Sequence, residues 1–537
     1  MKTIQKFLLL TLITLTAFLS ASQAQIFPTG EFSPGMEADN KKVIDFMKKW
    51  NIEGGSVAVL KDGRLVYAKG FGYADKDKER AATPYTIYRI ASVTKPITCI
   101  AIMQLVEQNK IKLDDKVFGA NGLLPEYTDL ITDNRLKQIT VRHLLKHQGG
   151  WDRKKDSKGN AYSPEFEPTI NKKSEIEASE GAYTRKAVMD FMVKRKLEFD
   201  PGSRSEYSNF GYFVLGRIIV KKSGMLYENY VKKYICDPLG IGSIQLGADA
   251  QNGALAGESV YYGGGAYGYV MDMMDAHGGL VASAPALGLI LRGVDKDVPG
   301  KKLLKDATID QMFNDGLCWG RNNTFKTYQH NGKLSGTSSY MTLGDNGISV
   351  VALFNRTSGD NDLYSEMYTL MMDLSKNVSI PSHDLYNNDA LYWKIKTSNY
   401  QAKFNELNGK GYRPTVIEGH TANNPMFDLI FRKDGKQAVS FHGLTSAQYQ
   451  AKFDELQKPQ YKGWDPADIT VYQEAGKVLY AGSFVKTNNP KWVARHDMSD
   501  AQFNTENSKW TGQGYHLVKG SKTVKSGKTY IAAVWYK

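Results

Sequence analysis

From Arg89 to Met103 the chain reads RIASVTKPITCIAIM, and this stretch decides how the first part of the protein folds. It starts polar and then becomes apolar on nearly every side, which is typical of a helix that is buried all round. Proline lacks an amide hydrogen and is tolerated only in the first turn of a helix, so Pro96 predicts that the helix begins close to Ser92. Because residues three apart share one face of a helix, the Lys95 amine is expected beside the Ser92 hydroxyl.

Ser92 and Lys95 have the spacing of a nucleophile and its base. A serine hydroxyl needs a neighbouring base, and a lysine in an apolar pocket can have its pKa lowered enough to serve. The Ser92 backbone amide is one of the unpaired donors at the helix start, available to stabilise an oxyanion. Ser483 and Lys486 repeat the spacing, but in a strand-like run where residues three apart point to opposite faces. Only the first pair is therefore predicted to be catalytic.

Two later segments carry polar groups suited to the same chemistry. Asp200–Tyr212 is a Pro-Gly turn that leads through Tyr207 and Asn209 into an apolar helix. A phenol and an amide held on such a loop could relay a proton and orient a substrate carbonyl. The other segment is His330–Lys333, which reads HNGK and stands just before a predicted hairpin. Gly332 there would let a substrate approach an edge strand closely.

The strands of this part of the chain stand at its two ends, and its middle is mostly helical. Hairpins are predicted at Ser56–Gly72 and at Ser339–Asn355, around Asp-Gly and Asn-Gly turns. Helical patterns precede the first hairpin and follow the last. The prediction is an α+β domain over residues 25–380, with an antiparallel sheet flanked by terminal helices and a helical insert between its early and late strands.

Near residue 380 a helical pattern breaks off and a region of internal repeats begins. Tyr400–Leu407, YQAKFNEL, recurs as Tyr449–Leu456, YQAKFDEL, and a weaker third copy runs from Gln502. Residues 384–537 are therefore predicted to be a small α+β domain of tandem repeats of about 50 residues. It resembles a bacterial tandem repeat domain found on secreted proteins. Its five tryptophans, of eight in the chain, either fill repeat cores or form a carbohydrate- or peptide-binding face, and their repeat-locked positions favour cores.

Residues 1–24 have the form of a signal peptide. Lys2 and Lys6 precede an apolar run from Phe7 to Leu19, and Ser22-Gln23-Ala24 puts small residues where a signal peptidase reads them. The protein is therefore expected to be secreted or periplasmic. The run is shorter than the roughly 20 residues that a bilayer needs, and no later segment is long and apolar enough to span one.

Composition and spacing argue against several other classes. The chain is 42% hydrophobic and 23% charged, and its net charge of +13 is spread without the Lys/Arg block of a nucleic-acid-binding protein. Cys99, Cys236 and Cys318 are too few and too scattered for a disulfide scaffold, and we expect them to be buried. His143 and His147 indicate a packed helix end, since no third metal ligand stands nearby. No metal or other cofactor is expected, and an alpha/beta hydrolase is excluded because no Gly-x-Ser-x-Gly elbow occurs.

In their order, the three polar segments resemble the serine beta-lactamase and penicillin-binding-protein family, most closely its branch of class C beta-lactamases, D-peptidases and related esterases. The resemblance covers roughly residues 38 to 375. It implies a beta-lactamase/transpeptidase-like fold. It also implies that Ser92 is the acylated nucleophile, that Lys95 takes its proton, and that Tyr207 shuttles the proton to the leaving group.

The resemblance further implies the groups that bind substrate. Asn209 would orient Lys95 and the substrate amide, and the oxyanion hole would pair the amides of Ser92 and Lys333. Beta-lactamases usually carry Lys-Thr-Gly where this chain has His330–Gly332. A histidine is mostly neutral at pH 7, so a permanent charge for a substrate carboxylate is missing and efficient beta-lactam hydrolysis is disfavoured. His-x-Gly is similar to what D-peptidases and esterases of this branch carry.

The sequence thus predicts a secreted serine hydrolase that forms an acyl-enzyme on a small ester or peptide substrate. Its pocket walls are expected from the variable region Trp151–Thr184. The alternative is a non-catalytic penicillin-binding-like protein that recognises cell-wall peptide or glycan. In either case the repeats are a candidate attachment to a cell-wall component. The presence of Ser92, Lys95, Tyr207 and His330 together favours the enzyme.

Overall fold

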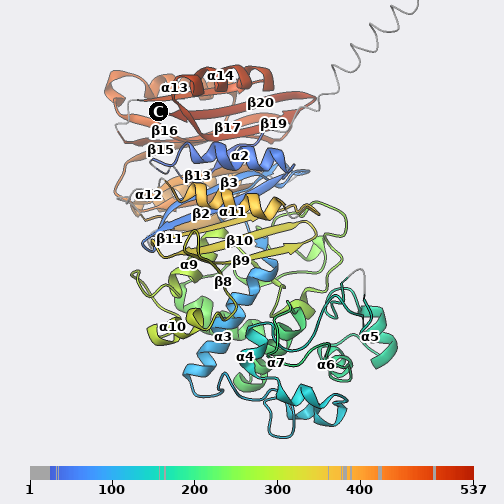
Figure 1. Ribbon diagram of the computed structural model, residues 1–537. Helices are drawn as coiled ribbons and strands as arrows, with labels where there is room; N and C mark the ends of the chain where they lie inside the picture. The colour runs from blue at the N-terminus through green and yellow to red at the C-terminus, as the bar shows by residue number, and fades with distance from the viewer. Residues whose placement is uncertain are drawn as a thin grey trace, which may run out of the picture.

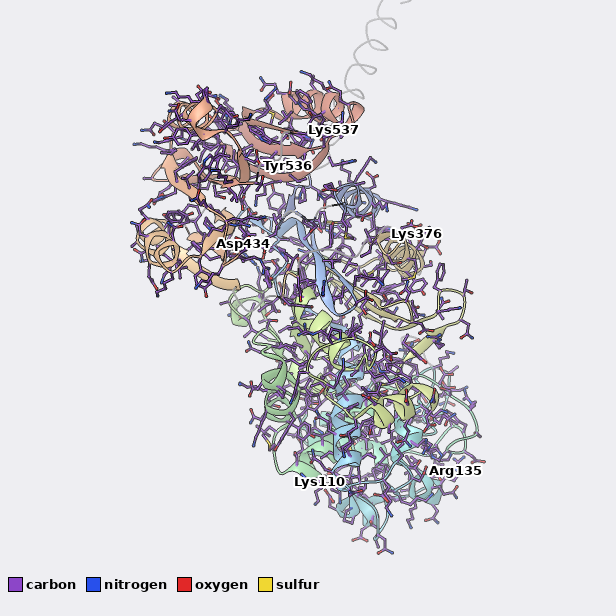
Figure 2. The ribbon with its side chains drawn as sticks, turned by 90° about the vertical axis from the view of Figure 1, so that its left-hand side faces the viewer. Lys110, Arg135, Lys376, Asp434, Tyr536 and Lys537 are labelled. Carbon is purple, nitrogen blue, oxygen red and sulfur yellow. The ribbon has the colours of Figure 1, made fainter. Side chains whose placement is uncertain are left out.

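A computed structural model describes residues 25–31, 33, 35–156, 158–161, 165–360, 362–376, 378, 384–386, 390–420, 426–487 and 491–537. The expected signal peptide lies outside these residues. The molecule is elongated, with a mostly helical region at one end, a large sheet in the middle and the repeats at the other end (Figure 1). The view turned by 90° agrees, since Lys110 and Arg135 lie far from Tyr536 and Lys537 (Figure 2).

The central sheet joins strands from both ends of the first domain. All its pairings are antiparallel, and the early and late strands meet where β2 pairs with β11, with Ala58 opposite Val351. The antiparallel sheet predicted from the two hairpins is confirmed. In sheet order, the strands are β1 (Pro28–Thr29), β3 (Arg64–Asp75), β2 (Gly54–Lys61), β11 (Ile348–Phe354), β10 (Thr337–Gly344), β9 (Thr327–Leu334) and β8 (Gly320–Asn322), with β4 (Arg80–Ala81) beside β3.

Helices cover both faces of this sheet. Because side chains alternate along a strand, Val57 and Val59 of β2 face one apolar cluster while Ala58 and Leu60 face another. The first cluster lies under α2 (Asp39–Lys49) and α11 (Asp362–Leu374), the two terminal helices. The second lies under α9 (Ala284–Gly293) and α3 (Thr94–Glu107). The expectation of terminal helices on an antiparallel sheet is confirmed.

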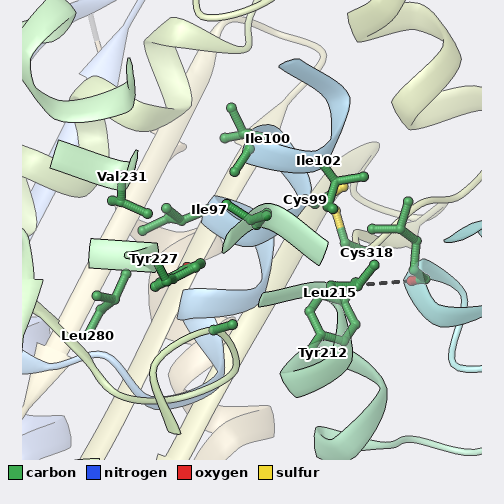
Figure 3. Packing of buried hydrophobic residues seen from close by; sticks show 14 of the residues in the cluster. Ile97, Cys99, Ile100, Ile102, Tyr212, Leu215, Tyr227, Val231, Leu280 and Cys318 are labelled. Atoms are coloured by element: carbon green, nitrogen blue, oxygen red, sulfur yellow. Dashed lines mark hydrogen bonds between the residues drawn. The ribbon is translucent and has the colours of Figure 1, made fainter. Parts of the chain in front are cut away.

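Helix α3 runs through the helical region as its core element. It is buried from Thr94 to Leu105, as its all-round apolar sequence predicts. Its Ile97 and Ile100 belong to the same apolar cluster as Tyr212 and Leu215 of α7, and Figure 3 shows part of this cluster. The other helices are α4 (Val141–Leu145), α5 (Lys173–Glu180), α6 (Arg185–Val193), α7 (Asn209–Ser223), α8 (Tyr227–Val231) and α10 (Asp306–Asn314), with a small sheet of β5 (Tyr88–Arg89), β7 (Leu280–Ala282) and β6 (Gln245–Leu246).

The C-terminal part consists of three similar units, each with a helix and a three-stranded antiparallel sheet. Trp535 is fully buried in the third unit, and Trp492 and Trp510 are half-buried against the cores, which supports the core-filling role of these aromatics. The elements are α12 (Tyr400–Gly409) with β12 (Ala390–Lys396), β13 (Arg413–His420) and β14 (Met426–Arg432); α13 (Ser446–Leu456) with β15 (Ala438–Leu444), β16 (Trp464–Glu474) and β17 (Lys477–Lys486); and α14 (Asp500–Gly512) with β18 (Trp492–Met498), β19 (His516–Lys525) and β20 (Lys528–Tyr536).

The first described residues of the chain pack into the last repeat. Phe27 belongs to the core of the third unit, and its ring centroid lies 5.1 Å from that of Phe503. Gly520 makes room for it, since a Cβ on Gly520 would come 2.1 Å from the Phe27 ring. An ion pair between Glu31 and the buried Arg432 ties the same segment to the first unit. The repeats are therefore joined to the first domain by packing as well as by the chain.

We expect Phe27→Ala to destabilise this junction by about 3 to 5 kcal/mol, the usual cost of removing a buried aromatic ring. The measurement is the midpoint of thermal unfolding together with limited proteolysis of the repeats. Phe325→Ala is the matched control, because Phe325 is 50% exposed. Equal stability of the two variants would contradict the junction.

Candidate active site

The turn before α3 sets the position of Ser92. Ala91 has φ of 47°, a left-handed conformation that is rare for a residue with a side chain. Two hydrogen bonds hold the preceding residue: the Ile90 amide donates to Leu280 O at 3.0 Å, and Ser339 Oγ donates to Ile90 O at 2.6 Å. Ser92 then lies in a single 3-10 turn, Ala91–Val93, and the α-helix itself begins at Thr94. The helix start predicted at Ser92 is thus within two residues of the observed one.

The side chains of two predicted residues, Lys95 and Tyr207, meet at the Ser92 hydroxyl. The Lys95 Nζ lies 3.0 Å from Ser92 Oγ, and the Tyr207 hydroxyl donates to the same oxygen at 2.7 Å. Lys95 Nζ also donates to Asn209 Oδ1 at 2.7 Å and to the His277 carbonyl at 2.8 Å. A neutral amine has two hydrogens and one lone pair. The two carbonyl oxygens can take both hydrogens, which leaves the lone pair of Lys95 for the proton of Ser92.

The charge states of Lys95 and Tyr207 suit different tasks. Lys95 is completely buried, and burial holds the pKa of its amine well below the usual range, so the neutral base is accessible. Burial raises the pKa of the Tyr207 phenol, which therefore stays protonated at neutral pH. Lys95 is consequently suited to accept a proton and Tyr207 to donate one.

Strand β9 lies directly against the turn that carries Ser92. A Cβ on Gly332 would come 2.3 Å from Ser339 Oγ and 2.4 Å from Ile90 O, so only glycine fits this contact. Strand β8 pairs with β9 only over Thr327–Gln329. From His330 onward, one edge of β9 pairs with β10, and within the described residues the other edge has no strand beside it. This free edge continues through Lys333, whose amide we expected in the oxyanion hole.

His330 is uncharged in this environment. Its Nδ1 lies 2.7 Å from the Asn331 carbonyl, which can only accept, so Nδ1 carries the hydrogen and Nε2 is left as an acceptor. Burial, helped by nearby Lys95, lowers the pKa of the imidazole to about 4. A substrate carboxylate therefore finds no cation at His330 at neutral pH, as the sequence predicted.

Two further histidines contact the site: His147, which was expected at a packed helix end, and His277, whose role the sequence did not determine. His147 follows α4 with φ of 55°; its Nδ1 accepts the Ser208 amide at 3.1 Å, and its ring centroid lies 4.5 Å from that of Tyr207. It therefore packs behind the phenol, and the sequence signal, a histidine at a helix end, gave no hint of that. His277 is buried and supplies the carbonyl that accepts from Lys95.

The variable region Trp151–Thr184 reaches the site, as expected, through three residues that the sequence did not single out. The Arg153 guanidinium carbon lies 5.0 Å from the centroid of the Tyr207 ring. Glu167 is buried beside Arg153, with 3.3 Å between Oε1 and Nη1. Thr169 Oγ1 lies 2.8 Å from His277 Nε2.

The structure also describes the groups that the sequence analysis set aside. Ser483 is buried and Lys486 is exposed on β17, so they do not form a second catalytic pair. The three cysteines are free and buried. Across the described ranges, no group of three or more His, Cys, Asp or Glu residues could hold a metal ion. In that same part of the chain, no helix has the length and apolar character to cross a membrane.

Comparison with known proteins finds family matches in both parts of the chain. Residues 40–369 match the family model "Beta-lactamase", and residues 390–434, 435–487 and 489–537 each match "Polyglycine hydrolase-like, structural repeat". Protein flp of Staphylococcus aureus (strain MW2) is 30% identical over 193 residues, 36% of this chain and 34% of that protein. Penicillin-binding protein 4* of Bacillus subtilis (strain 168) is 29% identical over 222 residues, 41% of this chain and 42% of that protein. The chain thus spans between a third and a half of the length of these curated relatives.

Solved structures show the same fold. The D-amino acid amidase of Ochrobactrum anthropi SV3, complexed with L-phenylalanine amide, superposes with a TM-score of 0.51 at 21% identity, over 63% of this chain and 98% of that one. Because the family match covers more than half of the chain, and because Ser92, Lys95 and Tyr207 converge within it, the assignment rests on both sequence and geometry. The chain belongs to the beta-lactamase family of serine hydrolases.

Proposed function

We propose that the protein is a secreted or periplasmic hydrolase that forms an acyl-enzyme at Ser92 on an ester or amide, in the range of D-peptidases and esterases. The observation that carries the proposal is the pair of carbonyl acceptors on Lys95. The Asn209 and His277 carbonyl oxygens take the two hydrogens of the neutral Lys95 amine. The lone pair of this buried amine then points at the Ser92 hydroxyl, 3.0 Å away. Export is proposed from the signal-peptide pattern of residues 1–24.

In the proposed acylation, the proton that Ser92 loses is accounted for by transfers through Lys95 and Tyr207. Lys95 takes the proton of Ser92 as Oγ forms a bond to the substrate carbonyl carbon. The carbonyl oxygen becomes an oxyanion, for which the Ser92 and Lys333 amides are the proposed donors. Tyr207 gives its proton to the leaving oxygen or nitrogen as that bond breaks, and the Lys95 ammonium returns a proton to the Tyr207 oxygen. Asn209 holds Lys95 and the substrate amide during these steps.

Because His330 is neutral, the proposal favours substrates that have no carboxylate near this residue. Beta-lactams and peptides with a free terminal carboxylate would place an anion near the third segment, where His330 offers a hydrogen-bond acceptor. Esters and amides without that carboxylate avoid this repulsion. Efficient beta-lactam hydrolysis is for this reason outside the proposal.

We expect a fluorophosphonate probe to add one covalent label to the full-length protein and none to Ser92→Ala. Intact-protein mass measurement reads the result, and Ser483→Ala, on β17, is the matched control that keeps the label. The same assay with a panel of esters, D-peptides and penicillin identifies the acyl donor; penicillin is included because one relative is named a penicillin-binding protein. No label from any of these compounds would overturn the proposal and favour a non-catalytic protein that recognises cell-wall peptide or glycan.

A further inference from the structure

Both carbonyl groups that hold Lys95 are braced by one short segment of the variable region. The Asn209 side chain accepts from Lys95 through Oδ1, and its amide group donates to the carboxylate of Glu167. The second acceptor is the backbone of His277, and its ring is held by Thr169 at 2.8 Å. Glu167 and Thr169 are two residues apart. The segment therefore contacts both of the residues whose carbonyl groups accept from Lys95.

Glu167 does not stand alone in this buried place. A carboxylate shielded from water needs a charged partner, because desolvation penalises its charge. Arg153 provides it: Nη1 lies 3.3 Å from Glu167 Oε1 and 3.1 Å from Glu165 Oε2. Burial raises the pKa of Glu167, while Arg153 and the hydrogen bond from Asn209 oppose that rise and favour the carboxylate. The same guanidinium covers the ring of Tyr207.

We propose that Glu167 and Arg153 act as a positioning pair for the base, in which Glu167 orients Asn209 toward Lys95 and Arg153 offsets the charge with which Glu167 would keep Lys95 protonated. This inference rests on the proposed function, because it concerns the proton acceptor of Ser92. It assigns the Arg153–Glu167 pair a task beyond lining the pocket: it sets the pH at which the nucleophile becomes active.

The surroundings of Lys95 leave few other charges to do this. Its neighbours from other elements are the rings of Tyr207 and Tyr212, at 4.7 and 5.6 Å from Nζ to the ring centroids, and three imidazoles. Burial and the nearness of Lys95 hold the pKa of each imidazole below its usual range, so all three are uncharged at neutral pH; they are His147, His277 and His330. Glu167 and Arg153 are the charged groups that act on Lys95, and they act in opposite directions.

The test uses charge-removing variants of both partners in the full-length protein. Glu167→Gln removes the anion that favours the Lys95 ammonium. In a plot of the fluorophosphonate labelling rate against pH, the acid limb, where the rate falls as the pH is lowered, should therefore move to lower pH. Arg153→Gln removes the opposing cation and leaves Glu167 unbalanced, so the limb should move to higher pH. Each shift should be about one pH unit, the usual effect of a charge a few ångströms away. Labelling rates are followed by intact mass from pH 5 to 9.

Two controls separate charge from structure. Glu165→Gln makes the same chemical change on the other, more exposed partner of Arg153, and its limb should move by much less than that of Glu167→Gln. Thr169→Val removes the hydrogen bond to His277 without changing any charge, so the rate should fall at every pH with the limb in place. Circular dichroism and the unfolding midpoint report whether each variant is folded.

Opposite shifts in the two folded variants support the pair. Shifts in the same direction, or none in either variant, overturn it even if the wild type is labelled normally. If the wild type itself takes no label at Ser92, the proposed function fails first, and the two failures are thereby distinguished. If one glutamine variant does not fold, Glu167→Asp takes its place, because it keeps the charge but shortens the reach to Asn209. This variant is expected to lower the labelling rate without moving the acid limb. A moved limb in this variant overturns the proposal.

Discussion

Replacing Lys95 with alanine should slow acylation of Ser92 by on the order of 10⁴-fold, the upper end of what a general base contributes. The reason is that, among the residues that the structure describes, no other base contacts Ser92 Oγ. The other group in hydrogen-bond contact is the Tyr207 hydroxyl, and burial raises the pKa of that phenol so that it holds its proton. The loss is measured as the labelling rate of a fluorophosphonate and of an activated ester, by intact mass.

Lys486→Ala is the matched control for this variant. Lys486 follows Ser483 at the same spacing of three, but it is exposed at the end of β17. The Lys486→Ala protein should react with the fluorophosphonate at the wild-type rate. A Lys95→Ala protein that keeps full turnover would refute Lys95 as the base. The wild type should also lose activity as the pH falls through the lowered pKa of Lys95, because the protonated amine cannot accept the Ser92 proton.

Gly332→Ala should reduce acylation by about 10²- to 10³-fold, the cost of losing one donor of an oxyanion hole. The added methyl would lie 2.4 Å from Ile90 O and 2.3 Å from Ser339 Oγ, well inside contact distance. Strand β9 must then move away from the turn that carries Ser92, and the Lys333 amide moves with it. The labelling rate measures the effect on the site, and the unfolding midpoint measures the effect on the fold.

The control for Gly332→Ala is Gly242→Ala, since a Cβ at Gly242 meets nothing within 4 Å. This variant should match the wild type in both measurements. If Gly332→Ala is folded and acylates at the normal rate, the edge of β9 at this residue does not form part of the oxyanion site.

The features that the sequence determined are those that depend on short spacings. Pro96 and the apolar run after it define where α3 begins and that it is buried, and the helical repeat alone brings Lys95 next to Ser92. The hairpins follow from alternation and from their Asp-Gly and Asn-Gly turns. The repeats follow from nearly identical octapeptides. Each signal acts within a few residues, so it is readable without knowing what the segment packs against.

Other parts of the site depend on contacts between distant segments. The Lys95 amine is held by groups 114 and 182 residues away, in Asn209 and His277. The resemblance to a known family indicated the first of these, but nothing local marks His277 as the second. The same is true of His147, whose ring takes its place behind Tyr207 only when α4 and α7 pack together.

What only the tertiary structure decided is the charge balance around the base. Arg153 and Glu167 stand in a Lys- and Ser-rich stretch whose composition names no ligand, and they become neighbours of Lys95 only when that stretch folds over Asn209. Local sequence fixes which groups a helix or turn presents. The pKa of a buried amine, by contrast, depends on every charge within a few ångströms, and those charges are assembled by packing.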